Sequence, residues 1–262
     1  MRHRRNCLRQ RQAGRGALIG PMVICGLVIE KKDEKKLKSL GVRDSKELSP
    51  KRREELAKVI EKIAKNLIVL RVPACRINSY MDKKINLDKI EAMKMSEIIN
   101  MVEAKVIYVD ALGNTNHSKT KRFESLIAEN LRRKDLKLIV ENYADETYPV
   151  VSAASIIAKV ERDKAIEELK LKVGFDFGVG YSHDHKTIQF LEKVLTEYKE
   201  KPNFIRWYWD TVENIATKLF EEGKKLQPWV KEEILGEKSL QKKIKDFFFK
   251  KVNCKEGKNE TG

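Results

Sequence analysis

Apolar residues along the chain follow two spacings, and each spacing predicts one kind of secondary structure. Continuous apolar runs occur at 22–29, 106–109 and 138–140, and a β-branched, mainly apolar run occurs at 67–72; each predicts a strand. Elsewhere apolar residues recur every three or four positions, which predicts helices that begin near residues 50, 86, 119, 149, 186 and 207. Strands are concentrated early and helices late. The pattern predicts an α/β protein whose largely parallel or mixed sheet is covered by helices.

Local signals mark where several of these elements start and stop. Ser49-Pro50 and Asn86 are typical of helix starts, because Ser and Asn cap the first turn and Pro suits its first position. Residues 1–12 show no strand pattern, and from about Gly236 onward the composition is Lys-rich and polar. We therefore expect an atypical basic start and a flexible tail.

Composition excludes several classes of protein. Hydrophobic residues make up 41% of the 262, which is enough for a core and excludes wholesale disorder. No apolar run approaches the ~20 residues of a membrane span. The four cysteines are far apart and form no CxxC pair, so we expect neither a disulfide framework nor a zinc module, and we expect a cytoplasmic protein.

The net charge of +16 is concentrated at the two ends of the chain. Residues 1–16 contribute +6, residues 238–262 contribute +5, and the 221 residues between them contribute only +5. A basic protein suggests a phosphate-rich partner. Solvated Lys/Glu-rich helix faces are the alternative, and charge does not decide between the two.

Two aspartates follow predicted strands. Asp110 ends the strand at 106–109, and Asp145 comes shortly after the strand at 138–140. Because ligands bind at strand ends in open α/β sheets, these carboxylates could share a divalent cation. The alternative is that both are ordinary loop residues, since Asp is common where a strand ends.

Several motifs together resemble ribonuclease HII, particularly its archaeal form. They are, in order, AGRG from Ala13, IGPMVI, Asp44-Ser45-Lys46, Tyr108-Val109-Asp110 and ADETYPVVSAASIIAKVERD from Ala144. The resemblance covers about residues 13–225. It implies an RNase H-like mixed five-stranded sheet flanked by helices, with a helical C-terminal part. It also implies an endoribonuclease that hydrolyses the RNA strand of RNA–DNA hybrids and cuts at ribonucleotides embedded in DNA.

The resemblance assigns roles to individual residues. Asp110 and Asp145 match the third and fourth members of an acidic quartet that binds Mn²⁺ or Mg²⁺, which would activate water for attack on phosphorus. Glycine suits close approach to a sugar, and the 2′-hydroxyl distinguishes RNA from DNA. The implied nucleic-acid contacts are Gly14, Arg15, Gly16, Ser45, Lys46 and Tyr181.

The chain departs from the family pattern directly before Ala13. The family has Asp-Glu there, whereas this chain has Arg11 and Gln12. Two unit charges about 4 Å apart interact by roughly 4 kcal/mol at an effective dielectric constant of 20, so an arginine beside a divalent ion is repulsive. The sequence therefore predicts weak metal binding and little turnover.

Two explanations of this departure stay open. Residues 1–12 are a misread or frameshifted start, which we favour because the disruption is abrupt, or the protein is a degenerate homologue. The function that we expect is that of an endonuclease. The alternatives are a catalytically impaired hybrid-binding protein and an adaptor that uses the nuclease-like domain as a scaffold.

The tail contains a second motif. Residues 241–248 resemble the box by which proteins dock on a PCNA-type sliding clamp, because one helical turn would gather its apolar residues into a plug for a groove. The residues concerned are Gln241, Ile244, Phe247 and Phe248. The alternative is an amphipathic helix that packs back on the domain.

The predicted organisation has four parts. These are an atypical N-terminus at 1–12, a catalytic domain at 13–185, a C-terminal helical region at 186–236 and the tail at 237–262. We also expect a monomer that binds no membrane.

Overall fold

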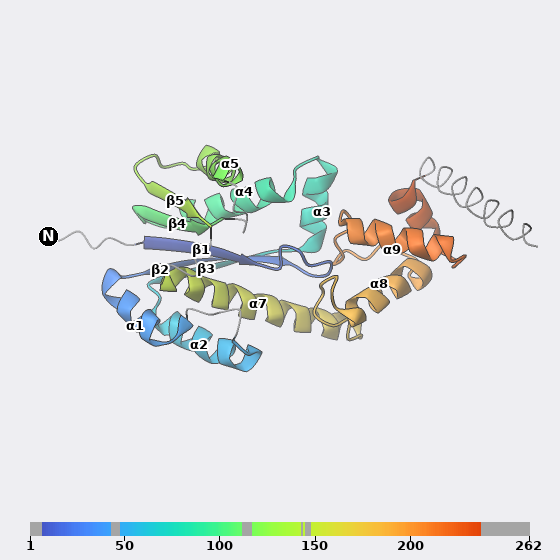
Figure 1. Cartoon of the computed structure of the whole chain (residues 1–262), viewed down its shortest axis with the longest axis horizontal. Coiled ribbons are helices and arrows are strands. Elements are labelled where there is room, and N and C mark those ends of the chain that lie inside the picture. Colours follow the sequence, from blue (N-terminus) through green and yellow to red (C-terminus); the bar gives the residue numbers. More distant parts are fainter. Residues whose placement is uncertain (1–6, 43–47, 112–116, 143, 145–147, 237–262) are drawn as a thin grey trace, which may run out of the picture.

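The fold is built on one mixed sheet of five strands. The computed structural model describes residues 7–42, 48–111, 117–142, 144 and 148–236. Its strands are Cys7–Ala13 (β1), Met22–Ile29 (β2), Asn66–Val72 (β3), Val106–Asp110 (β4) and Lys137–Glu141 (β5). They lie in the order β3-β2-β1-β4-β5 (Figure 1). The pairs β1–β2 and β2–β3 are antiparallel, whereas β1–β4 and β4–β5 are parallel.

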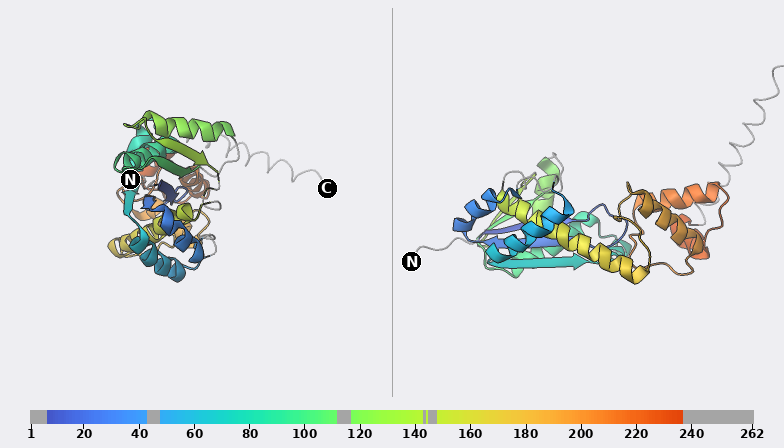
Figure 2. Two further views of the ribbon diagram at one scale, coloured as in Figure 1. Left: turned by 90° about the vertical axis from the view of Figure 1, so that its left-hand side faces the viewer. Right: turned by 90° about the horizontal axis from the view of Figure 1, so that it is seen from below.

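Helices cover both faces of this sheet, and others lie beyond its end. The helices among the described residues are Glu34–Ser39 (α1), Pro50–Ile63 (α2), Ala74–Asp82 (α3), Leu87–Asn100 (α4), His117–Glu129 (α5), Pro149–Val173 (α7), His185–Glu197 (α8) and Asp210–Glu221 (α9). In Figure 1, α4 and α5 lie on one face, and α7 with α1 and α2 lies on the other. Figure 2 shows α8 and α9, in orange, beyond the far end of α7. A π-helical segment, Val230–Leu235, packs on α9.

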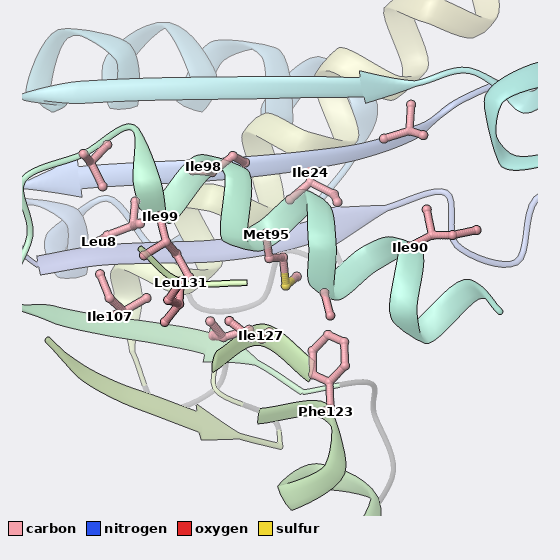
Figure 3. Packing of buried hydrophobic residues seen from close by; sticks show 14 of the residues in the cluster. Leu8, Ile24, Ile90, Met95, Ile98, Ile99, Ile107, Phe123, Ile127 and Leu131 are labelled. Carbon is pink, nitrogen blue, oxygen red and sulfur yellow. The ribbon is translucent and has the colours of Figure 1, made fainter. Parts of the chain in front are cut away.

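Three buried clusters fill the spaces between these layers. The first joins β1, β2 and β4 to α4 and α5, and Figure 3 shows Ile98 and Met95 of α4 in it together with Leu8 and Ile24. The second fills the space between the sheet and α7, and the third holds α8, α9 and the π-helical segment together. Two layers of helix on one sheet give the core that the α/β pattern predicts.

The predicted mixed sheet with flanking helices is confirmed. Helix α7 begins at the predicted residue, with Pro149 in its first turn, and Gly174 is in the left-handed conformation after its last residue. The two predicted caps also form, because the Ser49 side chain accepts from the Arg52 N–H and the Asn86 side chain accepts from the Lys89 N–H. The pattern did not predict α1 and α3.

The expectation that residues 1–12 contain no strand is wrong for residues 7–12. They form most of β1, which pairs with β2 on one side and β4 on the other. Leu8 and Gln10 are wholly buried on the face that packs on α4, and Gln10 Nε2 donates to the Met95 carbonyl at 2.9 Å. Backbone pairing on both edges and the hydrogen bond from Gln10 Nε2 outweigh the polar composition of this segment, although Gln10 Oε1 is buried without a partner among the described residues.

No helix in the part of the chain that the structure describes is both long enough and apolar enough to cross a membrane. The predicted boundaries at residues 13, 186 and 237 stay predictions.

Candidate functional site

Asp110 lies at the carboxyl end of β4, as the sequence predicts. Its neighbours in the sheet are β1, whose Gln10 is in register with Val109, and β5, whose Glu141 is in register with Asp110. The residue is 6% exposed, and Asp110 Oδ1 accepts from the Ala144 backbone N–H at 2.8 Å. Asp110 therefore links the end of β4 to the segment that follows β5.

The second carboxylate oxygen of Asp110 faces Arg11 of β1. Arg11 Nη1 forms an ion pair with Asp110 Oδ2, and the two side chains are 18% and 5% exposed. Because β1 runs parallel to β4 and extends beyond it, Arg11 is placed beside the strand end where Asp110 stands. Each oxygen of this carboxylate thus has a hydrogen-bonding partner within the protein.

The described residues around Asp110 do not fit a divalent cation. A guanidinium is already bound to the carboxylate, so the pair is net neutral, and Gln12 offers a neutral amide at most. Among the residues that the structure describes, no three His, Cys, Asp or Glu side chains are grouped as metal ligands. Asp145, the other predicted metal-binding residue, lies outside the described residues.

The Gly-Arg-Gly turn (residues 14–16) directly follows β1. Gly14 has φ +81°, and a Cβ there would lie 2.8 Å from the Pro21 carbonyl oxygen. At Gly16 a Cβ would meet nothing within 4 Å. The first glycine is therefore required by the backbone, whereas the second leaves open space beside the turn.

Arg15 does not point toward Asp110. Its guanidinium is ion-paired with Asp88 and Glu91 in the first turns of α4. Glu91 is wholly buried, and burial raises its pKa to about 7, although the Arg15 cation lowers it in part. Helix α4 thus holds the side chain in the middle of the Gly-Arg-Gly turn.

Tyr181 is brought to this turn from the far end of α7. The tyrosine loop (residues 178–183) forms a backbone bridge between Tyr181 and Ala17, and the N–H groups of Leu18 and Ile19 both donate to the Gly180 carbonyl, at 2.7 and 3.1 Å. The guanidinium of Arg162 lies 4.4 Å from the centre of the Tyr181 ring. Two segments about 165 residues apart therefore form one surface.

A cavity of about 230 Å³ with a mixed polar and apolar lining opens beside Arg15, between α4 and α5. Lys119 and Arg122 of α5 and the amide of Asn142 line it. Asn142 Nδ2 donates to Thr120 Oγ1 at 3.1 Å, which fixes the amide against α5. Asp88, which is ion-paired with Arg15, also lines the cavity, so the cations without a carboxylate partner in the lining are Lys119 and Arg122, and they suit an anionic ligand.

Some predicted residues lie outside the described residues. They are Ser45, Lys46, Asp145, Gln241, Ile244, Phe247 and Phe248. Conversely, the structure adds Asp88, Glu91, Arg162 and Arg206, which sequence reasoning missed. For Glu91 a signal existed, because it is an acidic residue on the apolar face of a predicted helix.

Comparison with known sequences gives consistent results. Residues 12–212 match the family model described as Ribonuclease HII. A Ribonuclease HII from Methanosarcina acetivorans is 41% identical over 225 residues, which span 82% of this chain and 97% of that protein. One from Methanocaldococcus jannaschii is 41% identical over 222 residues, with 79% and 93% covered.

Solved structures are similar over the same length. The ribonuclease H2 of Pyrococcus horikoshii OT3 has a TM-score of 0.72 at 37% identity, with 82% of this chain and 99% of that chain covered. The RNase HII in a PCNA:RNase HII complex from Archaeoglobus fulgidus has a TM-score of 0.69 at 38% identity, covering 80% and 96%. Bst-RNase HIII, in complex with Mn²⁺, has a TM-score of 0.68 at 17% identity, covering 82% and 70%, and shares the fold.

Proposed function

Because this chain belongs to the ribonuclease HII family and is an endoribonuclease of that family, we propose that it hydrolyses the RNA strand of RNA–DNA hybrids and cuts at ribonucleotides embedded in DNA. The observation that carries the proposal is the match over residues 12–212, together with a sheet that places Asp110 beside β1, the strand that leads into the Gly-Arg-Gly turn. Asp110 and Asp145 are the proposed catalytic residues.

The Gly-Arg-Gly turn and Tyr181 support a site that reads a sugar. The two are joined by the Ala17–Tyr181 bridge, and the space beside Gly16 lets another backbone approach closely. The 2′-hydroxyl, which only RNA carries, is the group that such a surface can distinguish. We propose that Gly14, Arg15, Gly16 and Tyr181 bind the ribonucleotide, that Ser45 and Lys46 contact the phosphate backbone, and that Lys119 and Arg122 extend the basic surface.

RNase H-family enzymes use divalent metals, and Mn²⁺ or Mg²⁺ is the proposed cofactor here. Arg11 and Gln12 stand where the family has Asp-Glu, and Arg11 is paired with Asp110. A site with an arginine in place of a carboxylate repels a divalent ion. The proposal therefore includes weak metal affinity and slow cleavage.

The tail is proposed to dock on a sliding clamp. The Archaeoglobus fulgidus relative forms a complex with PCNA, and this chain carries Gln241, Ile244, Phe247 and Phe248 at the spacing of a clamp-binding box. Three consecutive Phe in a Lys-rich segment are costly to expose without a partner.

Cleavage of an end-labelled DNA duplex with one embedded ribonucleotide tests the proposed function. In Mn²⁺ we expect one cut at the ribonucleotide, none in the all-DNA duplex, and none by an Asp110→Asn variant. Binding of the ribonucleotide duplex without cleavage would make the chain a hybrid-binding homologue instead. If the protein neither cleaves nor binds the ribonucleotide duplex, the remaining function is that of an adaptor whose nuclease-like domain is only a scaffold.

A further inference from the structure

Two buried arginines lie beneath the proposed ribonucleotide-binding surface and have no role in the function described so far. Arg162 belongs to α7 and is 4% exposed, and Arg206 lies in the segment between α8 and α9 and is wholly buried. The two come from parts of the chain that lie 44 positions apart, and both contact the segment that begins with the Gly-Arg-Gly turn.

Arg206 binds this segment at both of its ends. Arg206 Nη1 donates to the Arg15 carbonyl at 2.8 Å, and Nε donates to the Gly20 carbonyl at 3.1 Å. Its backbone N–H donates to the Leu18 carbonyl at 2.8 Å. One residue therefore fixes three carbonyl groups within residues 15–20, and its guanidinium lies over the Trp209 ring, 5.1 Å from the ring centre.

Arg162 connects the turn to the tyrosine loop. A Cβ at Gly14 would lie 3.0 Å from both Cδ and Nε of Arg162, so this side chain packs directly against the turn. Its Nη2 donates to the Val179 carbonyl at 2.6 Å, and its guanidinium lies 4.4 Å from the centre of the Tyr181 ring. The side chain thus spans from Gly14 to Tyr181.

Packing and charge explain why these positions are arginines. Only a guanidinium has several donors in a fixed plane, so it can bind two carbonyls at once or stack on a ring while donating from its edge. In the described part of the chain Arg206 contacts no carboxylate. Burial and, to a smaller extent, the Arg162 cation lower its pKa to about 9. Buried cations of this kind are costly to retain for packing alone.

We propose that Arg162 and Arg206 are positioning residues that hold the Gly-Arg-Gly turn and the tyrosine loop in one preformed geometry for binding a ribonucleotide. The identity of the ligand rests on the proposed function, whereas the positioning of the two loops does not. Preformed contacts lower the entropy cost of binding, so their loss weakens discrimination between sugars more than overall attraction to a duplex.

Hydrogen exchange of the free protein tests the positioning directly. In Arg162→Met and Arg206→Met, we expect amides within 14–20 and 178–182 to exchange at least ~10-fold faster, because local opening becomes easier. Arg162→Lys and Arg206→Lys keep the charge without the guanidinium plane and are expected to exchange faster as well. Arg71→Met is the control, since Arg71 is ion-paired with Glu161 and Glu168 on the exposed side of α7. Unchanged exchange in all four variants would overturn the proposal.

A binding measurement in EDTA tests the consequence for the substrate. The quantity is the affinity for a duplex with one ribonucleotide divided by the affinity for the matched all-DNA duplex. We expect the Lys variants to lower this ratio about 10-fold, with little change in the affinity for DNA. If this affinity ratio is unchanged in both Lys variants although their amides exchange faster, the proposal that the two arginines position the loops for ribonucleotide binding is overturned. A wild-type ratio of one would instead overturn the proposed substrate, and the exchange measurement would then decide the positioning.

Discussion

The Arg11 guanidinium is ion-paired with the Asp110 carboxylate across the neighbouring ends of β1 and β4. The other oxygen of Asp110 accepts from the Ala144 N–H, so the carboxylate joins three segments of the chain. Any cation that is to bind Asp110 must displace the guanidinium. Both partners are largely buried, so solvent screens their attraction less than that of a surface pair.

Replacement of Arg11 by glutamine is expected to raise the affinity for Mn²⁺ at least ~10-fold, because it removes a positive charge beside the proposed ligand. Titration calorimetry measures this affinity without any substrate. Arg133→Gln is the matched control, since Arg133 is paired with Asp135 and binds the Val102 and Ala104 carbonyls before the start of β4. Equal Mn²⁺ affinity in wild type and Arg11→Gln would contradict the role given to Arg11.

Glu91 is expected to make stability depend on pH. Burial raises its pKa from 4.5 to about 7, so the folded protein holds this proton more tightly than the unfolded chain does. The stabilisation is complete below pH 4.5 and is lost as the pH rises through 7. Relative to wild type, Glu91→Gln should gain up to about 3 kcal/mol in free energy of unfolding across that range.

Denaturant unfolding at several pH values measures this difference. The charged groups that face Glu91 are Arg15, Asp88 and Arg11. Asp88→Asn is the control, because Asp88 is ion-paired with Arg15 as Glu91 is, but its side chain is half-exposed. A stability difference between wild type and Glu91→Gln that stays constant from pH 4.5 to 8 would show that Glu91 is not a buried titrating group.

The two glycines of the Gly-Arg-Gly turn should respond differently to alanine. Gly14→Ala is expected to cost roughly 1–3 kcal/mol of stability, because φ is +81° and the new Cβ would meet the Pro21 carbonyl. Gly16→Ala has room and should stay within about 0.5 kcal/mol of wild type, yet weaken binding of the ribonucleotide duplex. Thermal unfolding and duplex binding measure the two effects. Full affinity in Gly16→Ala would remove this glycine from the proposed site.

Docking through the tail predicts a loss of clamp binding on substitution of two phenylalanines. A Phe247→Ala, Phe248→Ala protein should lose at least ~10-fold in affinity for an archaeal PCNA in a pull-down or surface-binding assay, because the apolar plug is removed. Phe249→Ala is the matched control, since it removes an adjacent Phe that lies outside the motif. Undiminished binding by the double variant would eliminate the tail as the docking segment.

Much of the fold follows from the sequence because its signals are local. The apolar run at 22–29 and the cap residues Ser49 and Asn86 act within one strand or one turn, and the structure contains the elements they predict. β1 was missed because its stability comes from strands distant in sequence, through pairing with β2 and β4 on both edges. No window of local hydrophobicity contains that information.

The candidate site likewise contains features that the sequence predicts and features that only the structure shows. The motif containing Gly14 and the strand-end position of Asp110 could be predicted from the sequence. The ion pair between Arg11 and Asp110 could not, nor could the packing of Arg162 against Gly14 or the hydrogen bond from Arg206 to Arg15, because these contacts join segments separated by about 100 residues or more. Such contacts are fixed by the fold rather than by local spacing.

The most direct test of this account compares cleavage at one embedded ribonucleotide, in Mn²⁺, by wild type and by an Arg11→Asp, Gln12→Glu double variant. Placing two carboxylates beside Asp110 should raise the rate at least ~100-fold, equivalent to about 2.7 kcal/mol of transition-state stabilisation, with the cut unchanged in position. Equal rates in the two proteins, or no cleavage by either, would contradict the claim that this is a ribonuclease limited by the Arg11–Asp110 ion pair.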